Sequence, residues 1–114
     1  MLIGELAAKT GVSTRALRHY EDEGLLIAQR KSNGYRHYDE SSTVVVEQIR
    51  TMISAGLVAS TIRRYLDCAR SGSEGTTLDM CPELKAELDR VAAQLEDRRA
   101  AIDVTKARLD LLRA

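Results

Sequence analysis

The sequence has no Trp, no Phe, a single Pro and two Cys among its 114 residues. Two Cys cannot provide the disulfide framework of a small secreted domain, and we expect both thiols to be reduced in a cytoplasmic protein. No apolar run approaches the roughly 18 residues that a membrane span needs. The first residues also lack the basic and then apolar pattern of a signal peptide. We therefore expect no membrane association.

Aromatic side chains are restricted to four Tyr, so the chain offers few walls for a catalytic pocket. It contains no Gly-rich phosphate loop and no nucleophile elbow. Its carboxylates do not form a spaced pair of the kind that acid–base catalysis uses. The sequence therefore predicts that the chain is not an enzyme, with no cofactor and no metal.

Net charge of either sign is also absent, because 17 basic residues balance 17 acidic ones. The charges are nevertheless unevenly distributed. Residues 9–36 hold six basic and three acidic side chains, whereas residues 71–114 hold seven basic and nine acidic ones. A basic N-terminal part is typical of a chain that meets a polyanion there, although charge alone fits an ordinary mixed surface equally well.

Two short helices are predicted near the N-terminus. Ile3 and Leu6 recur at helical spacing. Gly11 interrupts this pattern, and Ser13 is a favourable N-cap for a second helix that ends at Gly24. Two short helices joined by a tight turn with Gly form a helix-turn-helix unit.

The second of these helices collects polar side chains on one face. Arg15 and Arg18, three residues apart, share that face, whereas Leu17 and Tyr20 are expected to point inward. A small basic hairpin follows in residues 30–38, RKSNGYRHY. Its dipeptide Asn-Gly suits a type I′ turn, in which both central residues take positive φ.

Two further helices and a linker are predicted next. A third helix is expected after Asp39, and a fourth over residues 58–68. The expected core stripe of the third helix comprises Val44, Val45, Ile49, Met52 and Ile53. A Ser- and Gly-rich composition predicts a linker over residues 71–81. The domain organisation is then a domain over 1–70, this linker, and a helix over 82–114.

The C-terminal segment has the most regular pattern. Apolar residues alternate at spacings of four and three, interrupted by Arg98 and Thr105. The seven apolar members are Leu84, Leu88, Val91, Leu95, Ile102, Leu109 and Leu112. A single helix of about 50 Å cannot bury such a stripe by itself. We expect a coiled coil between two chains; the alternative is a helix folded back on its own domain.

The order of these parts resembles the MerR family of bacterial transcription regulators. The resemblance runs continuously from Ile3 to about Leu66, through IGELAAKTGVSTRALRHYEDEGLL, RKSNGYRHYD and EQIRTMISAGLVASTI. It implies a mainly α fold with a small β wing: a winged helix-turn-helix DNA-binding domain followed by a long dimerisation helix in an antiparallel coiled coil. Because the sequence ends at Ala114, we expect a short member without a C-terminal effector domain.

The resemblance also implies which residues contact DNA. The second helix would enter the major groove with Ser13, Thr14, Arg15, Arg18, His19 and Tyr20. The wing would follow the phosphate backbone with Arg30, Lys31, Asn33, Tyr35, Arg36 and Tyr38. The family commonly has Tyr in place of His19, which leaves its backbone contact open.

Each of these roles has a structural alternative. Arg15 and Arg18 could simply solvate an exposed face. Tyr20 and Tyr38 could belong mainly to the core, and Lys31 could be a solvated hairpin tip.

The implied function is a sequence-specific regulator that binds a pseudo-palindromic promoter site as a homodimer. The family is thought to act by distorting promoter DNA so that RNA polymerase can engage it, which makes the polymerase an expected partner. Two alternatives stay open. One is a protein-interaction adapter, and the other is a sensor-less architectural DNA-binding protein.

Cys68 and Cys81 are 13 residues apart and form no Cys-x-x-Cys pair. Cys81 stands just before the long helix, where some metal sensors of the family keep one thiolate. Such sensors need further ligands beyond the helix, and this sequence has none. Inert thiols are the leading expectation, with a thiol sensor as the alternative.

Overall fold

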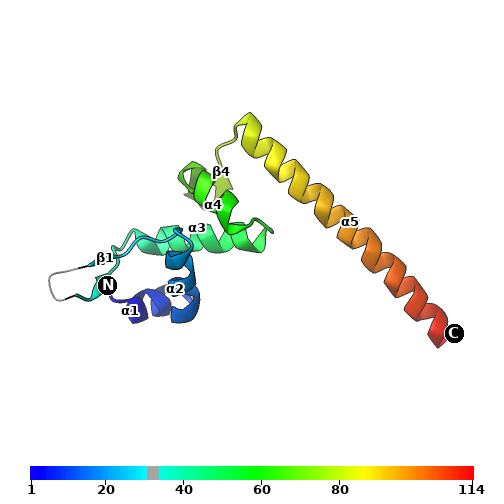
Figure 1. The fold of residues 1–114 in the computed structure, drawn as a ribbon, viewed down its shortest axis with the longest axis horizontal. Coiled ribbons are helices and arrows are strands. Elements are labelled where there is room, and N and C mark those ends of the chain that lie inside the picture. The colour runs from blue at the N-terminus through cyan, green and yellow to red at the C-terminus, as the bar shows by residue number, and fades with distance from the viewer. Residues whose placement is uncertain (31–33) are drawn as a thin grey trace. The chain divides into compact units, whose positions relative to one another are not determined.

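The computed structural model describes residues 1–30 and 34–114, which divide into two units, 1–79 and 80–114. Unit 1–79 begins with helices α1 (Ile3–Thr10) and α2 (Thr14–Asp22), joined by a three-residue turn (Figure 1). Gly11 ends α1 with a φ of 71°, a left-handed conformation that residues with a Cβ rarely adopt. The predicted helix-turn-helix unit is therefore present.

A two-stranded antiparallel sheet follows, with β1 (Gln29–Arg30) paired to β2 (Arg36–His37). The predicted turn residues Lys31 and Asn33 lie outside the described residues. Helices α3 (Ser42–Ser54) and α4 (Ala59–Tyr65) complete the helical part, and a 3-10 turn, η1 (Leu66–Cys68), follows α4. This mostly helical unit with a small wing confirms the predicted fold class.

The core of unit 1–79 lies where these helices meet, since α1 contacts α2 and α3, and α3 contacts α4. Its fully buried aliphatic side chains are Leu6, Leu17, Val46, Ile49 and Ile62. Each helix thus contributes at least one side chain to a single apolar interior, which fixes α2 with one face inward.

The expected stripe of α3 was partly wrong. Val46, Ile49 and Met52 form the buried face, whereas Val44 is 47% exposed. Positions 44 and 49 differ by five residues, which places their side chains about 140° apart around a helix. Ile53 is also exposed. Val46, by contrast, is three residues before Ile49, which places the two side chains on one face of the helix.

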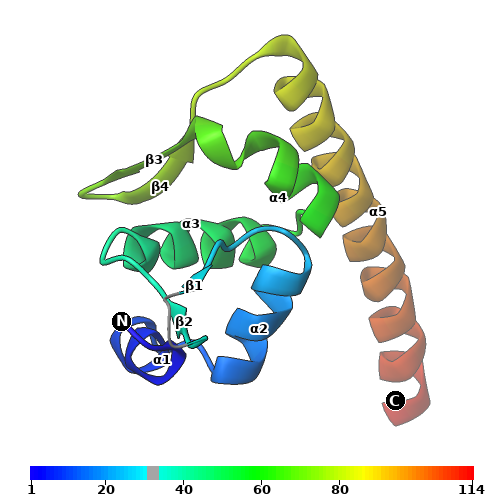
Figure 2. The same ribbon diagram turned by 60° about the vertical axis from the view of Figure 1, so that its left-hand side comes forward.

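A second β-hairpin occupies most of the expected linker. Strand β3 (Ala69–Gly72) pairs with β4 (Gly75–Leu78) in a continuous antiparallel register from Ala69↔Leu78 to Gly72↔Gly75, and it lies beside α3 (Figure 2). The Gln48 amide donates to the Ser71 hydroxyl at 3.1 Å, which ties this hairpin to α3. The Ser- and Gly-rich composition belongs to a tight turn rather than to an extended linker.

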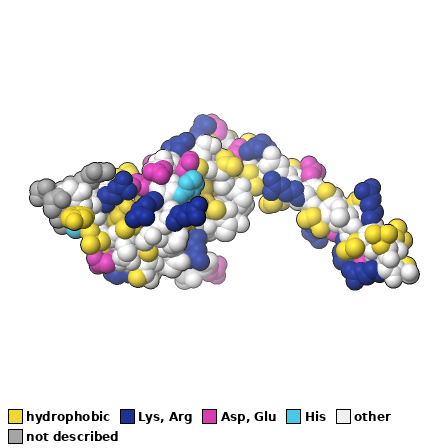
Figure 3. Space-filling model, turned by 60° about the horizontal axis from the view of Figure 1, so that its bottom comes forward, with side chains coloured by type: hydrophobic (Ala, Val, Ile, Leu, Met, Phe, Trp, Pro, Cys, Tyr) yellow, Lys and Arg dark blue, Asp and Glu magenta, His cyan; other side chains and the backbone are white. Residues whose placement is uncertain are grey.

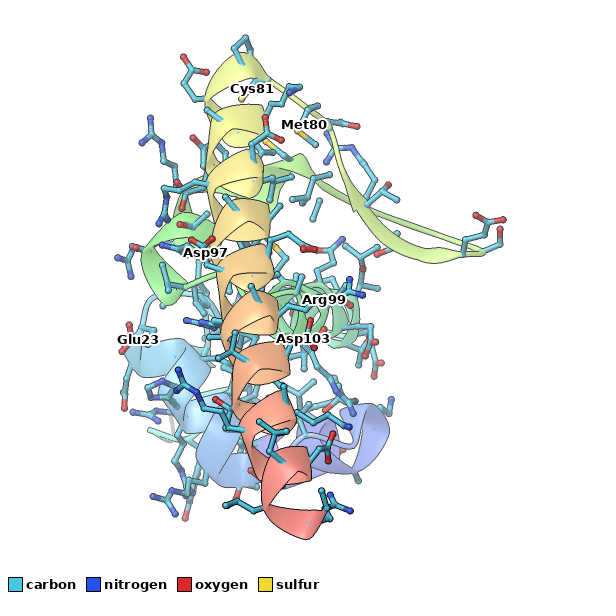
Figure 4. The ribbon with its side chains drawn as sticks, turned by 90° about the vertical axis from the view of Figure 1, so that its right-hand side faces the viewer. Glu23, Met80, Cys81, Asp97, Arg99 and Asp103 are labelled. Atoms are coloured by element: carbon cyan, nitrogen blue, oxygen red, sulfur yellow. The ribbon has the colours of Figure 1, made fainter. Side chains whose placement is uncertain are left out.

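Unit 80–114 consists mainly of helix α5 (Pro82–Arg113), which starts with Pro at its first position. Cys81 immediately precedes its first turn, and Asp97, Arg99 and Asp103 lie along its middle (Figure 4). None of the helices within the described ranges combines the length and apolar character that crossing a membrane requires.

Replacing Ile49 with Ala should lower the free energy of unfolding by about 2–5 kcal/mol, because it removes a fully buried side chain and leaves a cavity. Val44→Ala on the same helix is the matched control, with an expected change within about 0.5 kcal/mol. Urea unfolding followed by circular dichroism, at one protein concentration, measures both. Equal losses for the two variants would contradict the observed α3 face.

Candidate nucleic-acid interface

Helix α2 has one buried and one charged face. Leu17 is fully buried and Tyr20 is 8% exposed, whereas Arg15, Arg18 and His19 are all exposed. The structure therefore brings three of the predicted contact residues together on the outward face of one helix. Figure 3 shows basic side chains and a histidine gathered on one face of unit 1–79.

The start of α2 is fixed by a side-chain cap. The Ser13 hydroxyl accepts a hydrogen bond from the backbone nitrogen of Ala16 at 3.1 Å, which satisfies one of the helix's free amides. Ser13 is exposed and Thr14 is half-buried. Both predicted residues thus lie at the first turn, where a recognition helix presents its N-terminal side chains to base edges.

The wing is connected to α2 through Glu21. A guanidinium nitrogen of Arg36, Nη1, lies 2.7 Å from Oε2 of Glu21, and the Tyr38 hydroxyl donates to Oε1 of the same carboxylate at 3.4 Å. Arg36 remains 39% exposed at its side chain, while Glu21 is 17% exposed. Of the other predicted wing residues, Arg30 lies in β1 and Tyr35 is exposed.

Tyr38 supports the wing and does not face outward. It is 2% exposed, and its backbone exchanges two hydrogen bonds of 2.7 Å with the backbone of Met1. The contact of Tyr38 with the DNA backbone therefore stays a prediction, for a side chain that is almost fully buried. The alternative role weighed for this residue, packing in the core, fits the structure.

Two arginines from later helices contact the ends of the helix-turn-helix helices. Arg50 of α3 donates to the carbonyl of Thr10 at 3.3 Å, and Arg63 of α4 donates to the carbonyl of Glu23. The C-terminal carbonyls of a helix carry partial negative charge, so a cation there is favourable. The sequence carries no sign of the roles of Arg50 and Arg63, whose partners are 40 residues away. For Glu21, its unfavourable place at the C-terminal end of a helix indicated some partner for the carboxylate but not that this partner is Arg36.

The apolar stripe predicted along α5, the seam of the expected coiled coil, has a buried part and an exposed part. Leu84 and Val91 are buried and Leu88 is half-buried, whereas Leu95, Ile102, Leu109 and Leu112 are exposed. Ile102, Thr105 and Leu109 line a shallow groove along the helix surface. The Thr105 hydroxyl donates to the carbonyl of Ala101 at 3.0 Å, so this polar residue of the seam is satisfied within its own helix.

Cys68 and Cys81 are both free thiols and both half-buried. Within the described ranges, no three His, Cys, Asp or Glu side chains come together as a metal site would require. The structure adds no ligand to either thiol, and their role stays a prediction.

The surroundings of Tyr38 change its acidity. Burial raises the pKa of its hydroxyl above the usual value of 10.0, and the nearby Glu21 carboxylate raises it further, while Arg36 acts in the opposite direction. Burial and Glu21 both disfavour the charged phenolate, so the folded protein holds this proton more tightly than an unfolded chain does.

The chain is similar to one known protein family and to several curated proteins. A model described as MerR family regulatory protein matches residues 2–38, which span the helix-turn-helix unit and the wing. The nodulation protein NolA of Bradyrhizobium sp. (strain NC92) is 36% identical over 96% of this chain and 50% of its own length. The transcriptional regulator HmrR of Sinorhizobium medicae is 31% identical over 85% of this chain and 68% of its own.

A solved structure is also similar over almost the whole chain. The transcription regulator PbrR691 from Ralstonia metallidurans, determined in complex with lead(II), is 31% identical with a TM-score of 0.75. It covers 99% of this chain, which covers 85% of that structure. By contrast, the chain spans about half of the length of NolA from strain NC92, and less of the length of NolA from other Bradyrhizobium.

The raised pKa of Tyr38 predicts a pH-dependent loss of stability. Above pH 10 the unfolded chain releases this proton while the folded chain retains it, so stability falls as the pH rises from 10.0 towards the folded-state pKa. Tyr38→Phe removes the titrating group and should make this fall shallower. Urea midpoints measured about one pH unit below and above 10 test the difference.

The matched control is Tyr35→Phe, the same substitution at a tyrosine of the same segment whose residue is 66% exposed. If Y38F and the wild type lost stability in parallel over this range, Tyr38 would not titrate as described.

Proposed function

The chain belongs to the MerR family of transcription regulators, and from that premise we propose that unit 1–79 binds double-stranded DNA sequence-specifically. The observation that carries the proposal is the two-faced helix α2, whose buried Leu17 and Tyr20 hold Arg15 and Arg18 outward. An α-helix fits the major groove, where each base pair presents a distinct pattern of donors and acceptors.

Arg15 and Arg18 are the candidates for reading bases. A guanidinium fork can donate two parallel hydrogen bonds to O6 and N7 of guanine, which discriminates by about 1–3 kcal/mol. Ser13 and Thr14, at the first turn, can donate hydroxyl hydrogen bonds to a base edge or a phosphate. His19 is placed on the same exposed face, where it can reach the sugar-phosphate backbone.

The wing is the candidate for contacts without sequence information. The side chain of Arg36 is 39% exposed, and the sequence has two further cations, Arg30 and Lys31, shortly before it. Lys and Arg contacts to phosphates release condensed counterions, which supplies affinity that falls with salt. In this proposal the wing fixes the register of α2 on the duplex.

Dimerisation through α5 would double the reading length. One recognition helix reads too few base pairs to be specific, whereas two related by a two-fold axis read an inverted repeat. The exposed residues Leu95, Ile102 and Leu109 recur every seven residues, as one core position of a coiled coil does, and an antiparallel pair of α5 helices would cover them.

Promoter distortion and contact with RNA polymerase complete the proposal. Both come from the resemblance to the family. A protein that bends or untwists its site gains specificity from the deformability of the sequence between the half-sites.

The base-reading role is tested with Arg18→Ala. It should weaken binding to the preferred duplex by about 1–3 kcal/mol and narrow the preference over a scrambled duplex. Arg36→Ala should instead weaken both duplexes alike and lower the slope of log K against log salt by about 0.9 per protomer.

Fluorescence anisotropy over a salt series measures both variants. Arg99→Ala on α5 is the control, since it removes the same charge from an exposed side chain outside the helix-turn-helix unit. If R18A and R99A both bound the preferred duplex as the wild type does, the assignment of α2 as the reading helix would fail.

The dimer role is tested by replacing Leu95 and Ile102 with Asp. Two charges in the seam should convert the protein to a monomer in analytical ultracentrifugation, because an unpaired buried charge is costly. Val104→Asp is the matched control. Val104 is also exposed, but its side chain lies about 160° around α5 from that of Ile102 and about 180° from that of Leu95. A double variant that remained dimeric, or a monomer with full DNA affinity, would contradict the proposal.

A further inference from the structure

Three acidic residues, Glu21, Asp22 and Glu23, end the recognition helix α2. Carboxylates are unfavourable at this end of a helix, where the carbonyl groups already carry partial negative charge. They would also repel the phosphates of a duplex held by Arg18 and Arg36. The position of Glu21 therefore needs a compensating interaction.

That interaction is with the wing. Oε2 of Glu21 is 2.7 Å from Nη1 of Arg36, and Oε1 accepts from the Tyr38 hydroxyl at 3.4 Å. Tyr38 is held in turn by two backbone hydrogen bonds to Met1. One largely buried carboxylate on the recognition helix thus holds the end of strand β2 at two points.

The pairing leaves Arg36 able to bind a further anion. A guanidinium has five N–H donors, and the contact with Glu21 uses Nη1. The side chain of Arg36 remains 39% exposed, so its other donors can face solvent. A carboxylate on one side of the fork restricts the orientations of the other side, which lowers the entropy cost of binding a phosphate.

We propose that Glu21 is a positioning residue for DNA binding: it holds the Arg36 guanidinium at a fixed place relative to α2, so that phosphate contact by the wing and base reading by the helix occur in one register. The inference rests on the proposed function. It assigns a part in DNA binding to an acidic residue, Glu21, which does not itself contact the DNA.

The sign of the effect separates this role from simple electrostatics. Removing a negative charge beside a polyanion should strengthen binding, whereas loss of a positioning carboxylate weakens it. Glu21→Gln should lower affinity by about tenfold, the size of one charge-assisted hydrogen bond, and lower the salt slope by about 0.9 per protomer. The neighbouring Asp22→Asn, the matched control with the same charge change on an exposed residue, should bind equally or more tightly with an unchanged slope.

A double-mutant cycle with Arg36→Gln tests whether Glu21 acts through Arg36. In the R36Q background, E21Q should change affinity by no more than about twofold, since the group it positions is absent. Anisotropy with the preferred duplex measures the affinities, and titration at stoichiometric concentrations gives the active fraction of each variant. A variant that was only partly folded would lose active fraction and keep the wild-type slope.

The outcomes separate the two proposals. If the wild type bound no duplex specifically, the proposed function would fail and this inference with it. If the wild type bound specifically but E21Q behaved as D22N does, or lost affinity equally with and without Arg36, the positioning role alone would be overturned. If E21Q does not fold, Glu21→Asp replaces it in the double-mutant cycle with Arg36→Gln. Asp keeps the charge but is one methylene shorter, so its carboxylate lies farther from Arg36. A loss of affinity that disappears in the R36Q background again supports the positioning role, and an equal loss in both backgrounds overturns it.

Discussion

The burial of one face of α2 is the constraint on which the rest of the structure depends. Leu17 and Tyr20 contribute to an interior shared with α1, α3 and α4, and their burial determines which side chains of α2 face solvent. Arg15, Arg18 and His19 are outward because the opposite side is apolar. The hydrophobic burial that stabilises unit 1–79 therefore also leaves the cationic side chains of α2 together on its solvent-facing side.

Residues from the later part of the chain then hold this helix-turn-helix unit in place. Arg50 reaches the last carbonyl of α1, and Arg63 reaches the carbonyl that follows α2. Arg36 approaches α2 from the wing through Glu21. Each contact joins a cation to the negative end of a helix or to a carboxylate there. Short helices are marginal alone, so such long-range contacts and core packing together keep the two helices formed.

Local sequence signals were enough to predict the helix-turn-helix unit and the long C-terminal helix. Gly11 and Ser13 marked the turn, and the hydrophobic periodicity marked α2 and α5. Helical spacing from Ile49 separates Val44 from the core face, but it does not choose between Val45 and Val46, which are four and three residues before Ile49; packing against the other helices buries Val46. The same limit applies to the contact site: Arg36 was predicted, but its pairing with Glu21 depends on how the wing folds against α2.

The most direct test of the account is selection of duplexes by the wild-type protein from a randomised pool, followed by affinity measurements on the enriched sequences. A homodimer that reads bases with two copies of α2 should enrich an inverted repeat whose half-sites are related by whole helical turns. It should be bound at least roughly a thousandfold more tightly than the starting pool, with strong salt dependence. A pool that stayed random, with equal and weak binding of every duplex, would contradict sequence-specific reading by α2.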